Sequence, residues 1–187
     1  NIAIGKQALE SQTGGSANIA MGYLAGYSLV DGSFNVMIGQ NAGDTITTGD
    51  RNVAIGINSL STEDTGSYNV AVGYFALNAQ NADDTYNVAV GYEAGKSITT
   101  GPYNTIVGSK AGDALTTGDS NTVLGYNALS AEDTGDKNVA IGFEALTALN
   151  HDGSAYNVAI GYEAGHDVSS GIYNTLVGGL AGDKVTT

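Results

Sequence analysis

The stretch "NVAIGYEAGHDVSSGIYN", residues 157–174, nearly repeats the stretch "NVAVGYEAGKSITTGPYN" at residues 87–104. The whole 187-residue chain is built of such units, and each unit begins with an asparagine that has a glycine four residues later. A constant period of this length is the signature of an array whose units stack on one another. We expect residues 1–187 to form a single repeat array that is a fragment of a longer chain. The units start at residues 1, 18, 35, 52, 69, 87, 104, 121, 138, 157 and 174.

The pattern inside a unit predicts a short β-strand followed by turns. Position 1 is always Asn and position 5 is always Gly, while positions 2 and 4 are mostly Val or Ile and position 3 is mostly Ala. Side chains two apart share one face of a strand, so we predict that positions 2 and 4 face the core and Ala faces away. We also expect a second extended segment at positions 6 to 9, and we expect the asparagine to adopt the left-handed conformation of a coil corner.

Stacking of these strands gives the expected fold class. Parallel strands lie about 4.8 Å apart, so about eleven 17-residue coils would form an all-β β-roll or β-solenoid roughly 50 Å long. The row of asparagines would then form a ladder whose side-chain amides hydrogen-bond from coil to coil.

A second pattern appears at position 9, which is either Leu or Gly. In chain order the units read Leu, Gly, Gly, Leu, Leu, Gly, Gly, Leu, Leu, Gly, Gly. Each Gly unit has an aliphatic residue three positions later, which suggests a single core slot filled from two alternative loop conformations. The Leu units carry Leu9, Leu60, Leu77, Leu129 and Leu146, and the Gly units carry Leu29, Ile46, Ile98, Leu115, Val168 and Val185.

Composition excludes several classes of partner. The chain has 19 acidic and 6 basic residues, a net charge of −13 and no cluster of basic residues, which argues against binding to nucleic acid. It has no cysteine, and therefore no disulfide framework or thiolate metal site. No apolar run approaches the roughly 20 residues of a membrane-spanning helix, so we expect no membrane insertion by this segment.

Candidate ligand-binding residues are few, because a repeat array dilutes unique constellations. His151 and His166 lie in predicted turns without a partner at a recognised catalytic spacing, so we expect no enzymatic activity and no cofactor. The two longer units carry insertions at 78–86 and 147–156, and insertions in arrays map to loops on one face. The weak candidates in these loops are Asp83, Asp84, Tyr86, His151, Asp152 and Tyr156.

Three further residue patterns have both a structural and a functional interpretation. Ten of the eleven tyrosines fall at position 6 or just before the next Asn, and we interpret these columns as structural. The acidic pairs 63–64, 83–84 and 132–133 are interpreted as solvated turn charges, with calcium binding as the alternative. The threonine pairs 47–48, 99–100 and 116–117 leave ice binding as an alternative, although ice-binding solenoids carry regular Thr-x-Thr rows.

The units "NIAIGKQAL", "NVAIGFEAL", "NVAVGYEAG" and "NTIVGSKAG" resemble the head repeats of trimeric autotransporter adhesins. They resemble even more the Asn-Thr-x-Ile-Gly-Tyr arrays of phage tail fibres and related bacterial surface proteins, and the resemblance covers the whole chain. It implies a parallel β-roll that assembles as a homotrimer around a threefold axis. The small side chains at positions 3 and 5 fit such an assembly, because they would let neighbouring subunits approach closely.

These observations together predict a non-enzymatic fibrous protein. We expect the shaft or head segment of a trimeric phage tail fibre or bacterial surface adhesin, extracellular on the virion or cell surface, which spaces or presents a host-binding surface. Its partners would be further copies of itself and a host cell-surface glycan or receptor. The alternatives are an ice-binding or calcium-binding solenoid segment and a tail-spike polysaccharide depolymerase, which would need a cleft with paired carboxylates.

Overall fold

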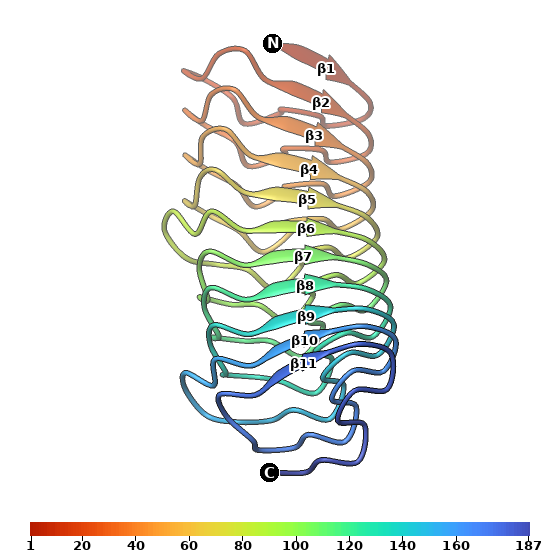
Figure 1. Cartoon of the computed structure of the whole chain (residues 1–187). Helices are drawn as coiled ribbons and strands as arrows, with labels where there is room; N and C mark the ends of the chain where they lie inside the picture. The colour runs from red at the N-terminus through yellow and green to blue at the C-terminus, as the bar shows by residue number, and fades with distance from the viewer.

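The chain forms one parallel β-solenoid, and the computed structural model describes all of residues 1–187 (Figure 1). Each sequence unit makes one coil, and the eleven strands stack in chain order in a single parallel sheet. The predicted all-β solenoid with one unit per coil is therefore confirmed. The strands are β1 Ile2–Ile4, β2 Ile19–Met21, β3 Val36–Ile38, β4 Val53–Ile55, β5 Val70–Val72, β6 Val88–Val90, β7 Thr105–Val107, β8 Thr122–Leu124, β9 Val139–Ile141, β10 Val158–Ile160 and β11 Thr175–Val177.

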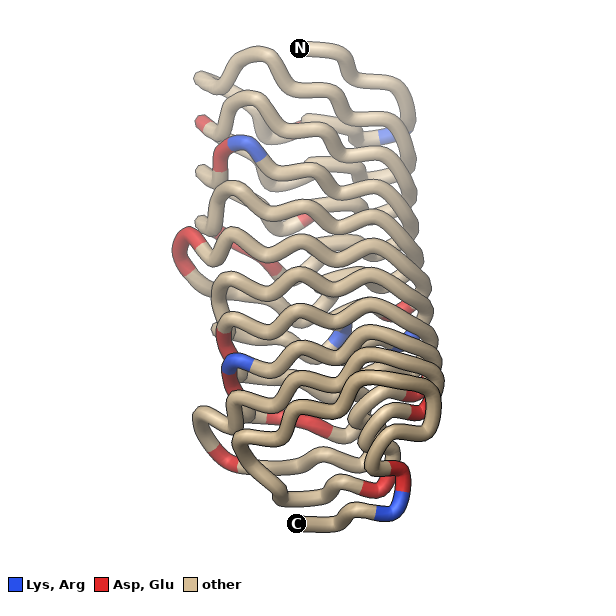
Figure 2. The backbone as a smooth tube through the Cα atoms, in the orientation of Figure 1, with Lys and Arg blue, Asp and Glu red and all other residues tan.

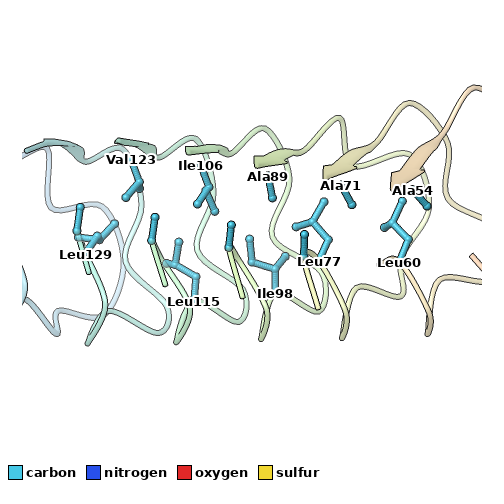
Figure 3. Close-up of a cluster of buried hydrophobic side chains, with 14 of the residues drawn as sticks. Ala54, Leu60, Ala71, Leu77, Ala89, Ile98, Ile106, Leu115, Val123 and Leu129 are labelled. Carbon is cyan, nitrogen blue, oxygen red and sulfur yellow. The ribbon is translucent and has the colours of Figure 1, made fainter. Parts of the chain in front are cut away.

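The strands face the opposite way from the sequence prediction. In β9, Ala140 is fully buried, whereas Val139 and Ile141 are partly exposed, and the other complete coils share this arrangement. Figure 3 shows the position-3 side chains pointing into the solenoid, toward leucines and isoleucines from the opposite wall. The interior has room for only a few large side chains in each coil, so the small residue faces inward in most coils. The prediction that Ala at position 3 forms the contact between subunits is wrong, because this side chain lies inside the solenoid.

Glycine at position 5 ends every strand because coils come closest there. Gly91 has φ +143°, and a Cβ on it would overlap the carbonyl oxygen of Gly108 in the next coil. Only glycine adopts this conformation and leaves room for the neighbouring backbone. The chain then turns through positions 6 to 9, so the second extended segment predicted there is absent.

The corners of a coil use left-handed residues other than the asparagine. The residue before each Asn has a positive φ, for example 54° at Tyr86 and 61° at Tyr103. The cost of this conformation is offset by regular bonding between coils: the Tyr103 amide, for instance, donates to the Thr85 carbonyl at 2.8 Å. The prediction that Asn itself occupies the left-handed corner is therefore wrong by one residue.

The asparagine ladder is present in full, and it binds backbone. At all ten steps the side-chain Oδ1 of one asparagine accepts the backbone N–H of the asparagine in the next coil, at 2.8 to 3.2 Å. In most coils Nδ2 also donates to a glycine carbonyl, as Asn87 does to Gly101 at 2.8 Å. Asn87 and its buried counterparts are thus satisfied on both amide atoms, which explains why the residue never changes.

Positions 9 and 12 both supply the core, as predicted. The prediction that Leu units and Gly units have different loop conformations is wrong, because Leu77 and Gly95 have similar φ values of 46° and 55°. Most coils of either kind have the hydrogen bond from the position-12 amide to the position-9 carbonyl; only coils 4 and 8 lack it. The buried members are Leu9, Leu29, Ile46, Leu60, Leu77, Ile98, Leu115, Leu129, Leu146, Leu149 and Val168.

Position 3 explains why the leucine pattern repeats every four coils. Where two Gly coils are adjacent, the second one carries a large residue at position 3, namely Met37, Ile106 or Leu176. A Cβ added to Gly95 would lie 3.1 Å from Cδ1 of Ile106, so the isoleucine occupies the volume that a leucine at position 9 would use. Constant core volume therefore links one coil to the next.

This exchange of volume predicts the behaviour of two variants. Replacing Ile106 with Ala removes the side chain that fills the space over Gly95, and it should destabilise the solenoid by about 2–5 kcal/mol. Adding Gly95→Leu should restore part of this loss, because coil 9 already holds both Leu146 and Leu149, with Ala159 at position 3 of the next coil. Urea denaturation followed by circular dichroism measures both effects. Equal stabilities of the single and double variants would contradict the exchange.

Candidate functional site

The outer face of the sheet runs along all eleven coils of the solenoid. We define it as the outward side chains at positions 2 and 4 of the strands, with the flanking residues at position 6 and just before each Asn. Its only charged residues are Lys6, Arg51 and Lys137, all basic, while the 19 acidic residues lie elsewhere. Figure 2 shows the strands free of charge and the charged residues in the turns around them. The outer face is therefore an exposed apolar surface on an acidic molecule.

A column of stacked aromatic and basic side chains borders the outer face on the side where the strands begin. The rings of Tyr68 and Tyr86 are 5.0 Å apart, and those of Tyr86 and Tyr103 are 5.7 Å apart, within 13° of parallel. The Arg51 guanidinium lies between the rings of Phe34 and Tyr68, at 5.2 and 5.5 Å from their centroids. Stacking at one ring per coil fixes these side chains before any partner binds.

A second column borders the outer face where the strands end. The rings of Tyr74 and Tyr92 are 5.4 Å apart, and Phe143 stacks at 5.3 Å on both Tyr126 and Tyr162. The two columns predicted from the tyrosine spacing are therefore present. Each ring keeps about half of its surface exposed, so the columns extend the apolar area of the outer face.

The first insertion loop projects beside β6, where Figure 1 shows it standing out from the coil. Asp83 and Asp84 are exposed, and the only side-chain partner of Asp83 is the Thr65 hydroxyl at 3.4 Å. Tyr86 belongs to the aromatic column, where partial burial, with the charge of Asp84 adding to it, raises the pKa of its hydroxyl. This loop thus presents two free carboxylates next to a stacked ring.

The second insertion loop projects beside β10 in the same way. Asp152 is exposed and accepts a hydrogen bond from the Thr134 hydroxyl at 2.9 Å, while His151 is half-buried. Tyr156 stacks on Tyr173 at 5.4 Å, with Lys137 5.7 Å from its ring centroid. Strands β6 and β10 are four coils apart, about 19 Å at one strand spacing per coil, so the candidate residues form two similar surfaces and not one site.

Two buried glutamates hold the insertion loops, and the sequence prediction missed them. Glu63 and Glu132 are fully buried, so the interpretation of their acidic pairs as solvated turn charges is wrong for these two residues. Glu63 accepts the Gly66 amide at 2.8 Å and the Gln80 side chain at 2.9 Å. The Glu132 carboxylate accepts the Gly135 amide at 2.8 Å and, from the second loop, the His151 amide at 3.1 Å.

This arrangement compensates for what the insertions remove. In coils 5 and 9, which contain the insertions, Asn69 and Asn138 make no hydrogen bond from Nδ2 to a glycine carbonyl of the next corner. The preceding coil supplies a glutamate that bonds across the gap instead. The signal in the sequence is the repeated "LSxEDTG" at 60–66 and 129–135, each time one coil before a longer unit.

The remaining surface has a cluster of charged side chains, in which Asp167 contacts His166 and Lys184. His166 contacts Asp167 at 2.7 Å in a half-buried position, but no three acidic or histidine side chains come together in a way that could hold a metal ion. No pocket opens in the surface, and no helix is long and apolar enough to cross a membrane. No protein-family model, curated protein or solved structure matches the chain. The outer face and the insertion loops are therefore the surfaces from which a function can be inferred.

The buried glutamates predict how stability depends on pH. Burial raises the pKa of Glu63 and Glu132 above the ordinary value of 4.5, although hydrogen bonds to the carboxylates act the other way. The folded state then keeps these protons at a higher pH than the unfolded chain does. Stability should therefore be greatest below the unfolded value and should fall as pH rises through the raised folded values.

Urea midpoints measured from pH 4 to pH 8 test this pH dependence. The double variant Glu63→Gln, Glu132→Gln should have a flatter profile than the wild type, because its loops are held by groups that do not titrate. Glu10→Gln, at an exposed site, is the matched control and should keep the wild-type slope. Identical slopes in the double variant and the wild type would show that these two carboxyl groups are not responsible.

Proposed function

We propose that this chain is a non-enzymatic segment of a fibrous protein, and that three copies assemble through the outer face into a stiff rod. The observation that carries the proposal is the apolar outer face, which runs without an acidic residue along all eleven coils. An exposed apolar surface of this length is a feature of proteins that bury it against a partner. In this proposal the rod is the shaft or head of a phage tail fibre or a bacterial surface adhesin.

The size of the outer face suits a stable interface. Eleven strands at about 4.8 Å and seven residues at about 3.3 Å give an area of roughly 50 by 20 Å, about 1,000 Å² per copy. Stable protein interfaces bury about 800 Å² per partner. In a trimer the outer face of each copy would be divided between two neighbours, so its burial supplies about 500 Å² to each contact and the bordering side chains would add to it.

A second copy of the chain is the partner that fits this face best. The face carries only three charged residues, all basic and all at its borders, so its centre has nothing that would select a charged partner. Its aliphatic columns at positions 2 and 4 are self-complementary, which suits a symmetric homo-oligomer. The resemblance of the units to tail-fibre and adhesin repeats favours three copies around one axis.

Assembly through the outer face would also place the acidic residues on the outside of the rod. With the outer face inside, the turns that carry most of the 19 acidic residues form the outside of the rod. A dense negative charge keeps rods soluble and prevents lateral association. The insertion loops would project from the edges of the interface, available to a glycan or receptor on a host cell.

Basic substitutions in the centre of the outer face should abolish assembly. In the double variant Val72→Lys, Val90→Lys, two charges would be buried in the interface, at a cost larger than the interface can compensate. We expect light scattering to give three times the chain mass for the wild type and the mass of one chain for the variant. The matched control Thr100→Lys, Thr117→Lys changes two exposed residues outside the outer face and should remain a trimer. A monomeric wild type would contradict the proposal.

Recognition of a host by the insertion loops is tested separately. If the loops bind a surface glycan, the variant Asp83→Ala, Asp84→Ala, Asp152→Ala should bind at least tenfold more weakly to an array of bacterial surface glycans than the wild type does. The control Glu10→Ala, Asp31→Ala removes exposed acids outside the loops and should bind normally. Unchanged binding by the loop variant would place recognition elsewhere on the rod.

A further inference from the structure

A rod assembled from repeated coils has a problem of register. Every coil presents nearly the same aliphatic pair at positions 2 and 4, so two copies shifted by one coil would bury almost the same apolar surface. Uniform apolar interfaces select register weakly, and a polar residue at one level is the usual device that fixes it. The outer face should therefore contain a level that differs from the others.

Strands β7 and β8 provide such a level in the middle of the rod. Position 2 is Ile or Val in the coils before β7 and in β9 and β10, but in β7 and β8 it is Thr105 and Thr122. Both threonine side chains are exposed, so their hydroxyl groups are available to a partner. The only other threonine at this position is Thr175, in the last coil.

The bordering columns also lack rings at this level, as they do after β3 and before β4, where Gln40 and Arg51 take these places. Ser109 replaces the aromatic residue after β7, and Ser120 replaces the one before β8. Tyr103, which has no ring stacked on its side toward Ser120, is 60% exposed, compared with 44% for Tyr86 inside the stack. The β7–β8 level is therefore the one where threonines at position 2 of two adjacent coils coincide with missing rings on both borders.

We propose that the β7–β8 level sets the register of the assembled copies. This inference rests on the proposed assembly through the outer face. In a parallel cyclic assembly, each level of one copy meets the same level of its neighbours. The hydroxyl groups of Thr105 and Thr122 then meet one another at the interface and exchange hydrogen bonds, and the rings missing at Ser109 and Ser120 leave a gap at the same height in every copy.

A shift by one coil breaks this match. It sets Thr122 of one copy opposite Val139 of its neighbour. It also sets Thr105 of the neighbour opposite Val88 of the first copy. Each of these hydroxyl groups is then buried against an apolar side chain without a partner, which is unfavourable. A shift by two coils doubles the number of such mismatches, so the in-register rod is the preferred assembly.

Cross-linking between single-cysteine variants measures the register, because the natural chain contains no cysteine. Tyr68→Cys and Tyr74→Cys lie at opposite borders of β5, on the same level, whereas Phe34→Cys lies two coils away, before β3. Mixed assemblies of Tyr74→Cys with either partner are treated with a short bis-maleimide. We expect the same-level pair to cross-link several-fold more than the offset pair.

The same measurement is then made in the background Thr105→Val, Thr122→Val. Valine is the natural residue at this position in other coils, so the variant should fold and still give the trimer mass by light scattering. We expect the offset pair to gain several-fold in yield, whereas Thr105→Ser, Thr122→Ser, which keeps the hydroxyl groups, should retain the wild-type ratio.

The outcomes separate the two proposals. A monomeric wild type would refute assembly through the outer face, and the register proposal with it. A trimer whose cross-linking ratio is the same in the wild type and in the valine variant would leave the assembly intact and overturn the role of the β7–β8 level. Loss of the wild-type ratio in the serine variant would equally contradict a role for the hydroxyl groups.

Discussion

The hydrogen bonds of the first asparagine in each coil are the interaction on which the rest of the structure depends. Its side chain accepts the amide of the next asparagine and, in most coils, donates to a corner carbonyl, so one residue aligns two coils at the point where the strand begins. Once the strand starts are aligned, the glycines at position 5 must also coincide, and their carbonyl oxygens leave no room for a side chain. The two constant residues, Asn at position 1 and Gly at position 5, therefore both follow from the alignment of adjacent coils.

Core volume is the second constraint, and it acts between coils. The interior accepts few large side chains per coil, so leucine at position 9 and a large residue at position 3 of the following coil exclude each other, as Gly95 and Ile106 show. This exclusion gives the core residues a period of four coils, in addition to the 17-residue period of the unit. The same four-coil period places Glu63 and Glu132 ahead of the two longer coils, where a carboxylate replaces the corner hydrogen bonds that the insertions interrupt.

The sequence was sufficient to predict the period, the parallel stacking, the asparagine ladder and the alternation of core residues, because each of these follows from constant spacing. It was not sufficient to decide which way the strand faces. Aliphatic residues at positions 2 and 4 of a unit, and the alanine between them, could each face the core. Only the limited volume of the interior decides that Ala140 lies inside and Ile141 outside. The buried glutamates were missed because an acidic pair in a turn, such as Glu63 with Asp64, usually faces solvent.

The reversal of the strands changes what the aliphatic residues are for. With alanine inside, the core of the solenoid is complete without Val139 and Ile141, which lie outside it beside the equivalent residues of the adjacent strands. A row of partly exposed and mostly aliphatic side chains eleven coils long would favour aggregation unless a partner covered it. The repeat keeps an apolar residue at position 4 in every coil and Val or Ile at position 2 in all but three, while it varies most turn positions freely. This contrast is the strongest physical reason to regard the outer face as a surface made for contact with further copies.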